Sequence, residues 1–432
     1  MIPIPSKRLL LSYKDMQPGK IMCQYLELIR RNKFKQAEMV KNYASYWHLD
    51  LFIYFYLPEI ATHPFADYHR EILNAIPHGT RNVRINILAP RGSAKTTMTT
   101  LVYPLHRILY APFDVLMGYP TEKFILIITF SEENSMDRIR SLMYVLETND
   151  RIKEDFGDRR SPTLWGVKGM HVKLGTDDAV CYVKPVTRGQ QIRGKLFFNT
   201  RPTLIIIDDI DEVLLLQNPN NRMNDQSWLF SDVMPAGEPE MTNYILVDTL
   251  KHEESLASLL RERPGWRTIF LRAVESPEQI RPHSTAEQLW ARWENLYTNR
   301  LISDAERLEN ANEFYQENME AMEEGVETLW PERIKYLDLR KAIIDEGYDF
   351  VMREYQNDIS YTTFRVFNMN EASRFTINSE GFLVTNPKLE EHEQLRQVHW
   401  EELVGISMYH DWAGGAKPVS YTHLTLPTIC SV

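Results

Sequence analysis

The stretch Leu88-Ala-Pro-Arg-Gly-Ser-Ala-Lys-Thr-Thr97 decides how this chain is interpreted. It follows an apolar, strand-like run from Val83 to Leu88 and leads into Met98-Thr-Thr-Leu-Val102, which can begin a helix. A strand, a loop of small residues and a helix form a cradle for phosphate, because backbone N–H groups and the positive end of the helix dipole point at anionic oxygens. In such a cradle Lys95 would reach the β- and γ-phosphates, and the Thr96 hydroxyl would hold Mg²⁺. The expected nucleotide contacts are Pro90, Arg91, Gly92, Ser93, Ala94, Lys95, Thr96 and Thr97.

A second apolar run, Leu204 to Ile207, is followed by the acids Asp208 and Asp209. Four consecutive aliphatic residues predict a fully buried strand of a parallel sheet. The acids then emerge at its carboxyl end, where open α/β sheets bind ligands. Nucleotide hydrolysis needs one acid to hold Mg²⁺ and one to polarise the attacking water. A buried strand followed by a solvated acidic turn is the alternative for this run alone, and the phosphate loop upstream favours hydrolysis.

These motifs and their order resemble the large subunit of tailed-phage terminases, the ATP-driven motors that package DNA into capsids. The Arg-Gly-x-x-Lys-Thr form of the phosphate loop is characteristic of that family, and further landmarks follow in the family's order. The resemblance covers about Phe65 to Gly415. Its later landmarks are the strand Phe124–Ser131, the helix ending at Arg151, Asp155-Phe-Gly157, Gly189-Gln-Gln-Ile-Arg-Gly194, Arg201-Pro202, the Asp208-Asp209 strand, Tyr244-Ile-Leu-Val-Asp-Thr249, Leu329-Trp-Pro-Glu332 and Phe350–Asp358.

The resemblance implies ATP hydrolysis coupled to translocation of double-stranded DNA into the procapsid. Lys95 would neutralise phosphate charge, and Thr96 and Asp208 would hold Mg²⁺. Asp209 or Glu212 would orient the attacking water. The family often has Asp-Glu at the strand end where this chain has Asp208-Asp209, so both candidates for the second acid stay open.

Further site residues follow from the same resemblance, each with a structural alternative. Arg91 resembles an arginine that acts on the γ-phosphate within one subunit, and Arg193 is a candidate finger for a neighbouring subunit. Thr249 would sense the γ-phosphate, unless it is an ordinary strand-end threonine. Tyr68 or Arg70 would contact adenine, and packing at the start of a helix is the alternative for both.

The implied ligands are ATP and Mg²⁺. The implied partners are double-stranded DNA, the portal protein, the terminase small subunit and further copies in a homo-oligomeric ring on the capsid. The implied location is the cytoplasm of a phage-infected bacterium, transiently at the procapsid portal. Two alternatives remain: a helicase-like ATPase that acts on nucleic acid, and a fragment that binds nucleotide without turnover.

Composition is compatible with these expectations. The 432 residues are 43% hydrophobic, which supports a large core and excludes a disordered chain. The net charge of −10 argues against a surface largely devoted to nucleic acid, but not against a local basic channel. The longest apolar stretch, Leu51 to Leu57, is far shorter than the ~20 residues that span a bilayer, so no membrane partner is expected. The three cysteines form no disulfide framework.

We expect an α/β protein with a P-loop ATPase core. A helical region at 1–80 precedes the core at 81–274, whose alternating strands and helices predict a mostly parallel sheet. A helical lid or linker subdomain at 275–377 and a linker at 378–400 follow. The core strands are expected near 83–88, 124–130, 204–207, 244–247 and 268–271.

The last part of the chain divides into two pieces. Residues 401–418 resemble the first strand of the RNase H-like nuclease domain of terminases, with Asp411 as one of several acids that bind two divalent ions, Mg²⁺ or Mn²⁺. Residues 419–432 begin with a run that matches the translation of a transposase mosaic-end sequencing adapter. One carboxylate cannot form a two-metal site, so we expect no nuclease activity from this chain.

Overall fold

The computed structural model describes residues 3–175, 178–194, 196–275 and 285–360, and the backbone of three short strands at 374–378, 381–385 and 395–399. Residues 1–362 and 363–432 form two compact units, which are described separately. The predicted nuclease strand at 401–418, Asp411 and the adapter-like residues 419–432 lie outside the described residues.

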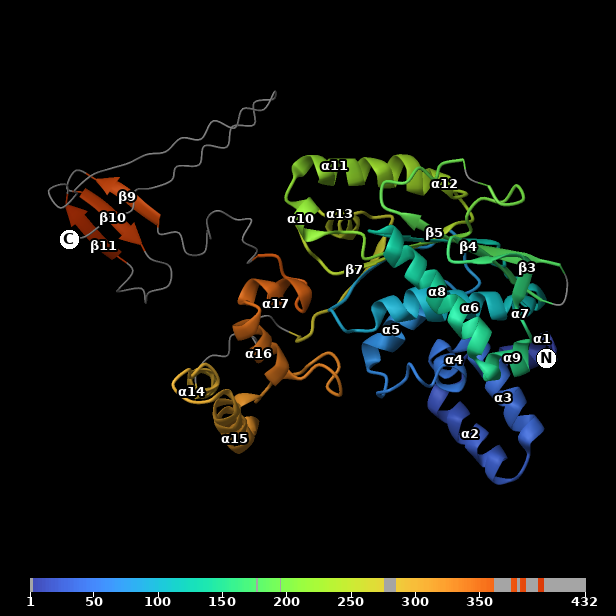
Figure 1. Ribbon diagram of the computed structural model, residues 1–432, viewed down its shortest axis with the longest axis horizontal. Helices are drawn as coiled ribbons and strands as arrows, with labels where there is room; N and C mark the ends of the chain where they lie inside the picture. Colours follow the sequence, from blue (N-terminus) through green and yellow to red (C-terminus); the bar gives the residue numbers. More distant parts are fainter. Residues whose placement is uncertain are drawn as a thin grey trace. The chain divides into compact units, whose positions relative to one another are not determined.

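An eight-stranded sheet forms the centre of the first unit, in the order β3-β4-β5-β2-β6-β7-β1-β8. Figure 1 labels its strands β3, β4, β5 and β7. Every neighbouring pair from β5 to β8 is parallel, whereas β3 with β4 and β4 with β5 are antiparallel. The predicted α/β fold with a mostly parallel sheet is confirmed. The strands are β1 (Arg84–Leu88), β2 (Phe124–Thr129), β3 (Arg160–Gly166), β4 (Gly169–Lys173), β5 (Val180–Thr187), β6 (Leu204–Asp208), β7 (Asn243–Asp248) and β8 (Arg267–Phe270).

Helices cover both faces of the sheet. In β2, Ile125 and Ile127 belong to one buried cluster, while Leu126 and Ile128 belong to another. Because side chains alternate across a strand, the two clusters are the two faces. The first face packs against α6 (Tyr103–Leu109), α7 (Ala111–Met117), α8 (Glu132–Thr148), α9 (Asp150–Phe156) and the N-terminal helices, and the second against α11 (Pro219–Trp228), η2 (Leu229–Val233), α12 (Met234–Ala236) and α13 (Leu256–Arg261).

The helix after the phosphate loop begins as a π-helix, η1 (Thr97–Val102), and continues as α6. Thr99 Oγ1 donates to the Lys95 carbonyl at 2.9 Å, and Thr100 Oγ1 donates to the Thr96 carbonyl at 2.8 Å. Pro104, the second residue of α6, has no N–H to donate. Threonine hydroxyls that bond to carbonyls one turn earlier, and a proline that lacks the N–H of a regular helix, both favour a widened turn at this point.

Five helices fill the predicted N-terminal region: α1 (Lys7–Leu11), α2 (Pro18–Arg30), α3 (Phe34–Trp47), α4 (Leu49–Tyr56) and α5 (Asp67–Ala75). A buried ion pair between Arg107 of α6 and Asp114 of α7 joins this region to the core, because Tyr46 Oη also donates to Asp114 at 2.9 Å. Tyr103 Oη donates to the Pro77 carbonyl at 2.7 Å. The N-terminal helices are therefore part of the same compact unit as the sheet.

In the described residues, four helices lie in the predicted lid or linker subdomain, which is called the lid below: α14 (Thr285–Tyr297), α15 (Asp304–Met322), α16 (Tyr336–Asp345) and α17 (Tyr348–Glu354). The lid is hydrogen-bonded to the segment that follows β8. Ala273 N donates to Tyr355 O at 2.8 Å, and Leu329 N donates to Ala273 O at 2.7 Å. Trp330 Nε1 donates to the Pro64 carbonyl at 3.0 Å and so contacts the N-terminal region. None of the described helices is both long and apolar enough to cross a membrane.

The second unit contains a three-stranded antiparallel sheet, β11-β10-β9, made of β9 (Arg374–Asn378), β10 (Gly381–Thr385) and β11 (Leu395–His399). The sequence predicts a linker over 378–400, whereas the structure has β10 and β11 within that range. Pro387 and the acids at 390, 391 and 393 suggest a linker locally, but the strands are stabilised by hydrogen bonds to partners that a single-segment pattern does not show.

Candidate active site

The phosphate loop connects β1 to η1 at the carboxyl edge of the sheet. Gly92 has φ of +79° and Ala94 has φ of +59°, so both adopt the left-handed conformation. Glycine adopts it freely, whereas alanine pays about 1–2 kcal/mol, so the loop is held in shape by its surroundings at Ala94. Two backbone contacts support it: Ala89 N donates to Asp248 O at 3.3 Å, and Arg91 N donates to Glu354 O at 2.9 Å.

Lys95 points back across its own loop. Its Nζ donates to the carbonyl oxygens of Ala89 at 2.7 Å and Pro90 at 3.4 Å. Burial lowers the pKa of Lys95, and the carboxylates of Asp248 and Asp209 oppose that shift. A cation held by weak carbonyl acceptors beside these acids is available to a stronger anionic ligand such as a phosphate.

The loop and the β6 acids meet directly, since Thr96 Oγ1 donates to Asp208 Oδ1 at 2.8 Å. The other carboxylate oxygen of Asp208 accepts from Arg138 Nε at 2.9 Å. Asp208 is fully buried, and this burial raises its pKa although Arg138 opposes the shift. A hydroxyl beside a carboxylate suits Mg²⁺, which takes few protein ligands and completes its shell with substrate phosphates and water. Among the described residues, no group of three or more His, Cys, Asp or Glu offers a metal site made of protein alone.

The two candidates for the second acid lie in different places. Asp209 directly follows β6 with φ of +49°, and its carboxylate contacts the Lys251 ammonium. Partial burial raises the pKa of Asp209, but the Lys251 and Lys95 ammonium groups together outweigh it and hold that pKa below its usual range. Glu212 instead caps α10 (Val213–Leu216), accepting from Leu215 N at 3.1 Å. The local geometry therefore favours Asp209 as the acid that faces the phosphate loop.

Asp248 and Lys251, which the sequence analysis does not select, complete the cluster. Asp248 ends β7, is fully buried and has a pKa raised by burial to about 7 despite Lys251, whose Nζ lies 3.0 Å from Asp248 Oδ1. A signal was present in the sequence, because β7 is a second apolar strand that ends in an acid. Arg138 lies within α8, more than one turn from its start, and no sequence motif marks it.

Three further predicted site residues are Tyr68, Arg70 and Arg91, and of these the Tyr68 side chain contacts the phosphate loop. Tyr68 Oη donates to the Ser93 carbonyl at 3.1 Å, and its buried ring packs on His69 at 3.8 Å between centroids. Arg70 is half exposed and pairs with Asp67 and Asp50. The Arg91 side chain is exposed.

Thr249 is buried after β7, and its N–H donates to Asp248 Oδ1 at 2.7 Å. Arg193 lies in an exposed turn after β5. The structure thus brings Tyr68, Lys95, Thr96, Asp208, Asp209 and Thr249 to the carboxyl edge of the sheet.

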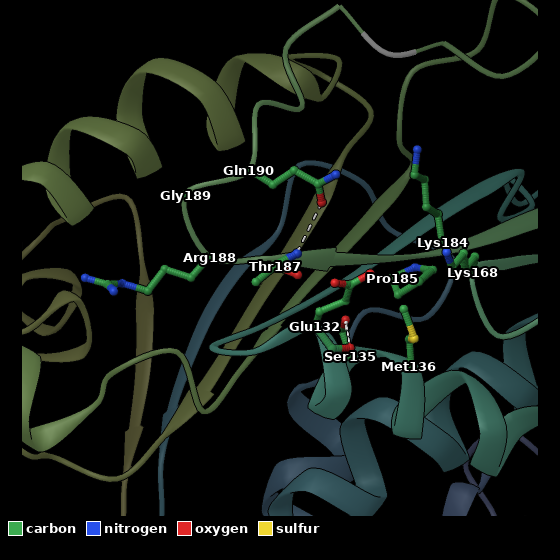
Figure 2. Close-up of a pocket in the computed structure, with 10 residues that line it drawn as sticks. All are labelled: Glu132, Ser135, Met136, Lys168, Lys184, Pro185, Thr187, Arg188, Gly189 and Gln190. Atoms are coloured by element: carbon green, nitrogen blue, oxygen red, sulfur yellow. Dashed lines mark hydrogen bonds between the residues drawn. The ribbon is translucent and has the colours of Figure 1, made fainter.

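A separate pocket of about 530 Å³ lies at the carboxyl end of β5 and the start of α8 (Figure 2). Its lining includes the basic residues Lys168, Lys184 and Arg188 and the acid Glu132 of α8. Arg188 points away from the pocket in Figure 2, and it forms a two-pronged ion pair with Asp225 at 2.6 and 2.7 Å. No phosphate-loop residue lines this pocket, so it is distinct from the candidate active site.

No protein-family model and no curated protein matches the chain. Among solved structures, it is similar to the HK97 bacteriophage large terminase, at 12% identity and a TM-score of 0.40 over 78% of this chain. The match covers 64% of the HK97 protein, so the chain spans less than two thirds of that length. It is also similar to the ATPase domain of the Thermus phage P74-26 large terminase, at 11% identity and a TM-score of 0.31, covering 68% of this chain and 100% of that domain. A point mutant of the same domain gives 11% identity and a TM-score of 0.36, covering 98% of it.

Proposed function

We propose that this chain is the ATP-hydrolysing motor subunit of a phage terminase. The contact between Thr96 and Asp208 supports the proposal most directly, because it joins a phosphate loop to an acidic strand end 112 residues away in sequence. A strand-end acid beside the loop hydroxyl is the arrangement that Mg²⁺-dependent nucleotide hydrolysis requires. The arginine form of the loop and the order of the later motifs, not the fold alone, favour a terminase.

In the proposed reaction, Lys95 turns from its loop carbonyls to the β- and γ-phosphates of ATP. Thr96 and Asp208 would hold Mg²⁺, which would neutralise charge on the phosphates when bound. Asp209 orients a water whose oxygen bonds to the γ-phosphorus as the bond from that phosphorus to the bridging oxygen breaks. The electron pair of the broken bond stays on ADP, and the water's protons end on inorganic phosphate and bulk solvent.

The wider role is part of the same proposal. The substrate of the motor would be double-stranded DNA, and its partners would be a portal protein, a terminase small subunit and further copies of this chain in a ring. It would act in the cytoplasm of an infected bacterium. Asn357 and Glu354 support a coupling role for the lid, because both contact segments that border the candidate active site.

Phosphate release by the purified chain tests the proposal against its alternatives. We expect turnover that requires Mg²⁺, is lost in EDTA and rises with duplex DNA. Displacement of one strand from a forked duplex would favour a helicase-like enzyme. Binding of labelled ATP with no phosphate release under any of these conditions would favour a fragment that only binds nucleotide.

A further inference from the structure

Lys251 is a buried cation that forms two hydrogen bonds and a further ion pair with oxygen atoms around it. It follows β7 by three residues, and its side chain is 9% exposed. Its Nζ contacts the Asp209 carboxylate, lies 3.0 Å from Asp248 Oδ1 and donates to the Asp211 carbonyl at 2.7 Å. An ammonium group has three protons to donate, so these contacts fix its position.

The Asp248 carboxylate, which contacts this cation, is itself held in place by backbone N–H groups. Its Oδ2 accepts from the N–H groups of Ile210 at 3.0 Å and Asp211 at 3.1 Å, and its Oδ1 accepts from Thr249 N at 2.7 Å. The carboxylate therefore joins the turn after β6 to the turn after β7. A fully buried carboxylate requires such partners, and Lys251 supplies the matching charge.

Asp209 differs from Asp248 in being open to solvent. Its side chain is 56% exposed, and its backbone is held in the left-handed region while its N–H donates to Val247 O at 2.9 Å. An exposed aspartate normally samples several side-chain rotamers. The contact with Lys251, which is made through Asp209 Oδ1, selects one of them.

We propose that Lys251 is a positioning residue for ATP hydrolysis, which holds the Asp209 carboxylate in the orientation that orders the attacking water. This inference rests on the proposed function, since it requires Asp209 to be the second acid. The contacts of the Lys251 ammonium are with Asp209, Asp248 and the Asp211 carbonyl. Its effect on turnover passes through Asp209 alone. If Lys251 only stabilised the ends of β6 and β7, its substitution would lower turnover whether or not Asp209 is present.

A double-mutant cycle in ATP turnover separates the two roles. Lys251→Met should lower kcat by roughly tenfold to a hundredfold, because it misplaces Asp209 without removing it and so costs no more than the lower end of the roughly 10²- to 10⁴-fold that a positioned acid or base contributes. It should leave KM for ATP within about twofold. In an Asp209→Asn background, Lys251→Met should cause no further loss, because the residue that it positions is gone. Enough enzyme is used for the residual turnover of Asp209→Asn to be measured. Lys20→Met, at an exposed site on α2, is the matched control and should behave as the unmodified chain.

The outcomes distinguish the inference from the proposal on which it rests. If Asp209→Asn turns over ATP at the unmodified rate, Asp209 is not the second acid and that part of the proposed function fails. If Asp209→Asn is slow but the losses from the two substitutions multiply, Lys251 acts independently of Asp209 and the inference is overturned. Should Lys251→Met not fold, Lys251→Gln replaces it in the same cycle, since glutamine keeps N–H donors for Asp248 and the Asp211 carbonyl.

Discussion

Asn357 joins the lid to the end of β7, because its Oδ1 accepts from Leu250 N at 2.7 Å. Its Nδ2 donates to the Leu271 carbonyl at 2.7 Å, so one side chain bridges the segments that follow β7 and β8. Leu250 lies between Thr249 and Lys251 in the chain, which places this bridge directly beside the candidate active site. The segment after α17 is thereby hydrogen-bonded to the segment that carries Lys251.

Asn357→Ala should destabilise the chain by about 1–3 kcal/mol, because two buried backbone groups lose their partner. Asn357 is 2% exposed and has φ of +50°, a conformation that asparagine tolerates better than alanine. Urea unfolding measures the change. Asn312→Ala, on the exposed face of α15, is the control and should shift stability by no more than about 0.5 kcal/mol. Equal stability of Asn357→Ala and the unmodified chain would contradict the bridging role.

Asp208→Asn should weaken Mg²⁺-dependent nucleotide binding by roughly ten- to a hundredfold, which corresponds to loss of one charge-assisted contact. The substitution also leaves Arg138 without its carboxylate partner. Titration of a fluorescent ATP analogue with and without Mg²⁺ measures the effect. An affinity that keeps its full dependence on Mg²⁺ in this variant would place the metal elsewhere.

Asp209→Asn and Glu212→Gln should differ in turnover. We expect Asp209→Asn to bind nucleotide normally and to hydrolyse it roughly 10²- to 10⁴-fold more slowly. Glu212→Gln should hydrolyse at nearly the unmodified rate, because the Glu212 carboxylate caps α10. Glu212→Ala should cost about 1 kcal/mol of stability through loss of that cap. Slow hydrolysis by Glu212→Gln with normal hydrolysis by Asp209→Asn would reverse the assignment.

Stability should fall as the pH drops from about 6.5 towards 3, partly through His106. This residue is fully buried with Nε2 2.9 Å from the Ser45 carbonyl, and burial, aided by Arg107, lowers its pKa to about 3. Between the two pKa values the unfolded chain binds the proton and the folded chain does not, so acid favours unfolding by up to about 1.4 kcal/mol per pH unit. Urea unfolding at a series of pH values measures the slope. His106→Gln should reduce it, and an unchanged slope would show that His106 does not contribute.

The sequence predicts the parts of the fold that have local patterns. The strands β1, β2, β6, β7 and β8 are apolar runs, and each forms near the predicted residues. The strands β3 to β5 were not predicted, because Pro162 and Pro185 interrupt them and Lys173 and Lys184 break the apolar pattern. They pair at one edge of the sheet, where only β5 lies beside a parallel strand.

The candidate site was predictable only where a motif marks it. Lys95, Thr96 and Asp208 belong to such motifs and lie together. Lys251 does not, because its contacts depend on the register that sets the ends of β6 and β7 side by side, with Asp208 opposite Val247. Nor does spacing alone show that Glu212 turns back to cap a helix.

Comparison of Lys95→Ala with the unmodified chain in steady-state ATP turnover tests the central claim most directly. Lys123→Ala, an exposed lysine just before β2, is the matched control. We expect Lys95→Ala to keep its circular dichroism spectrum and thermal midpoint and to lose turnover by roughly several hundredfold, because about 3–4 kcal/mol of charge stabilisation is removed from the transition state. The control should hydrolyse ATP at the unmodified rate. A folded Lys95→Ala protein that retains most of its turnover would contradict the assignment of residues 90–97 as the phosphate-binding loop of an ATPase.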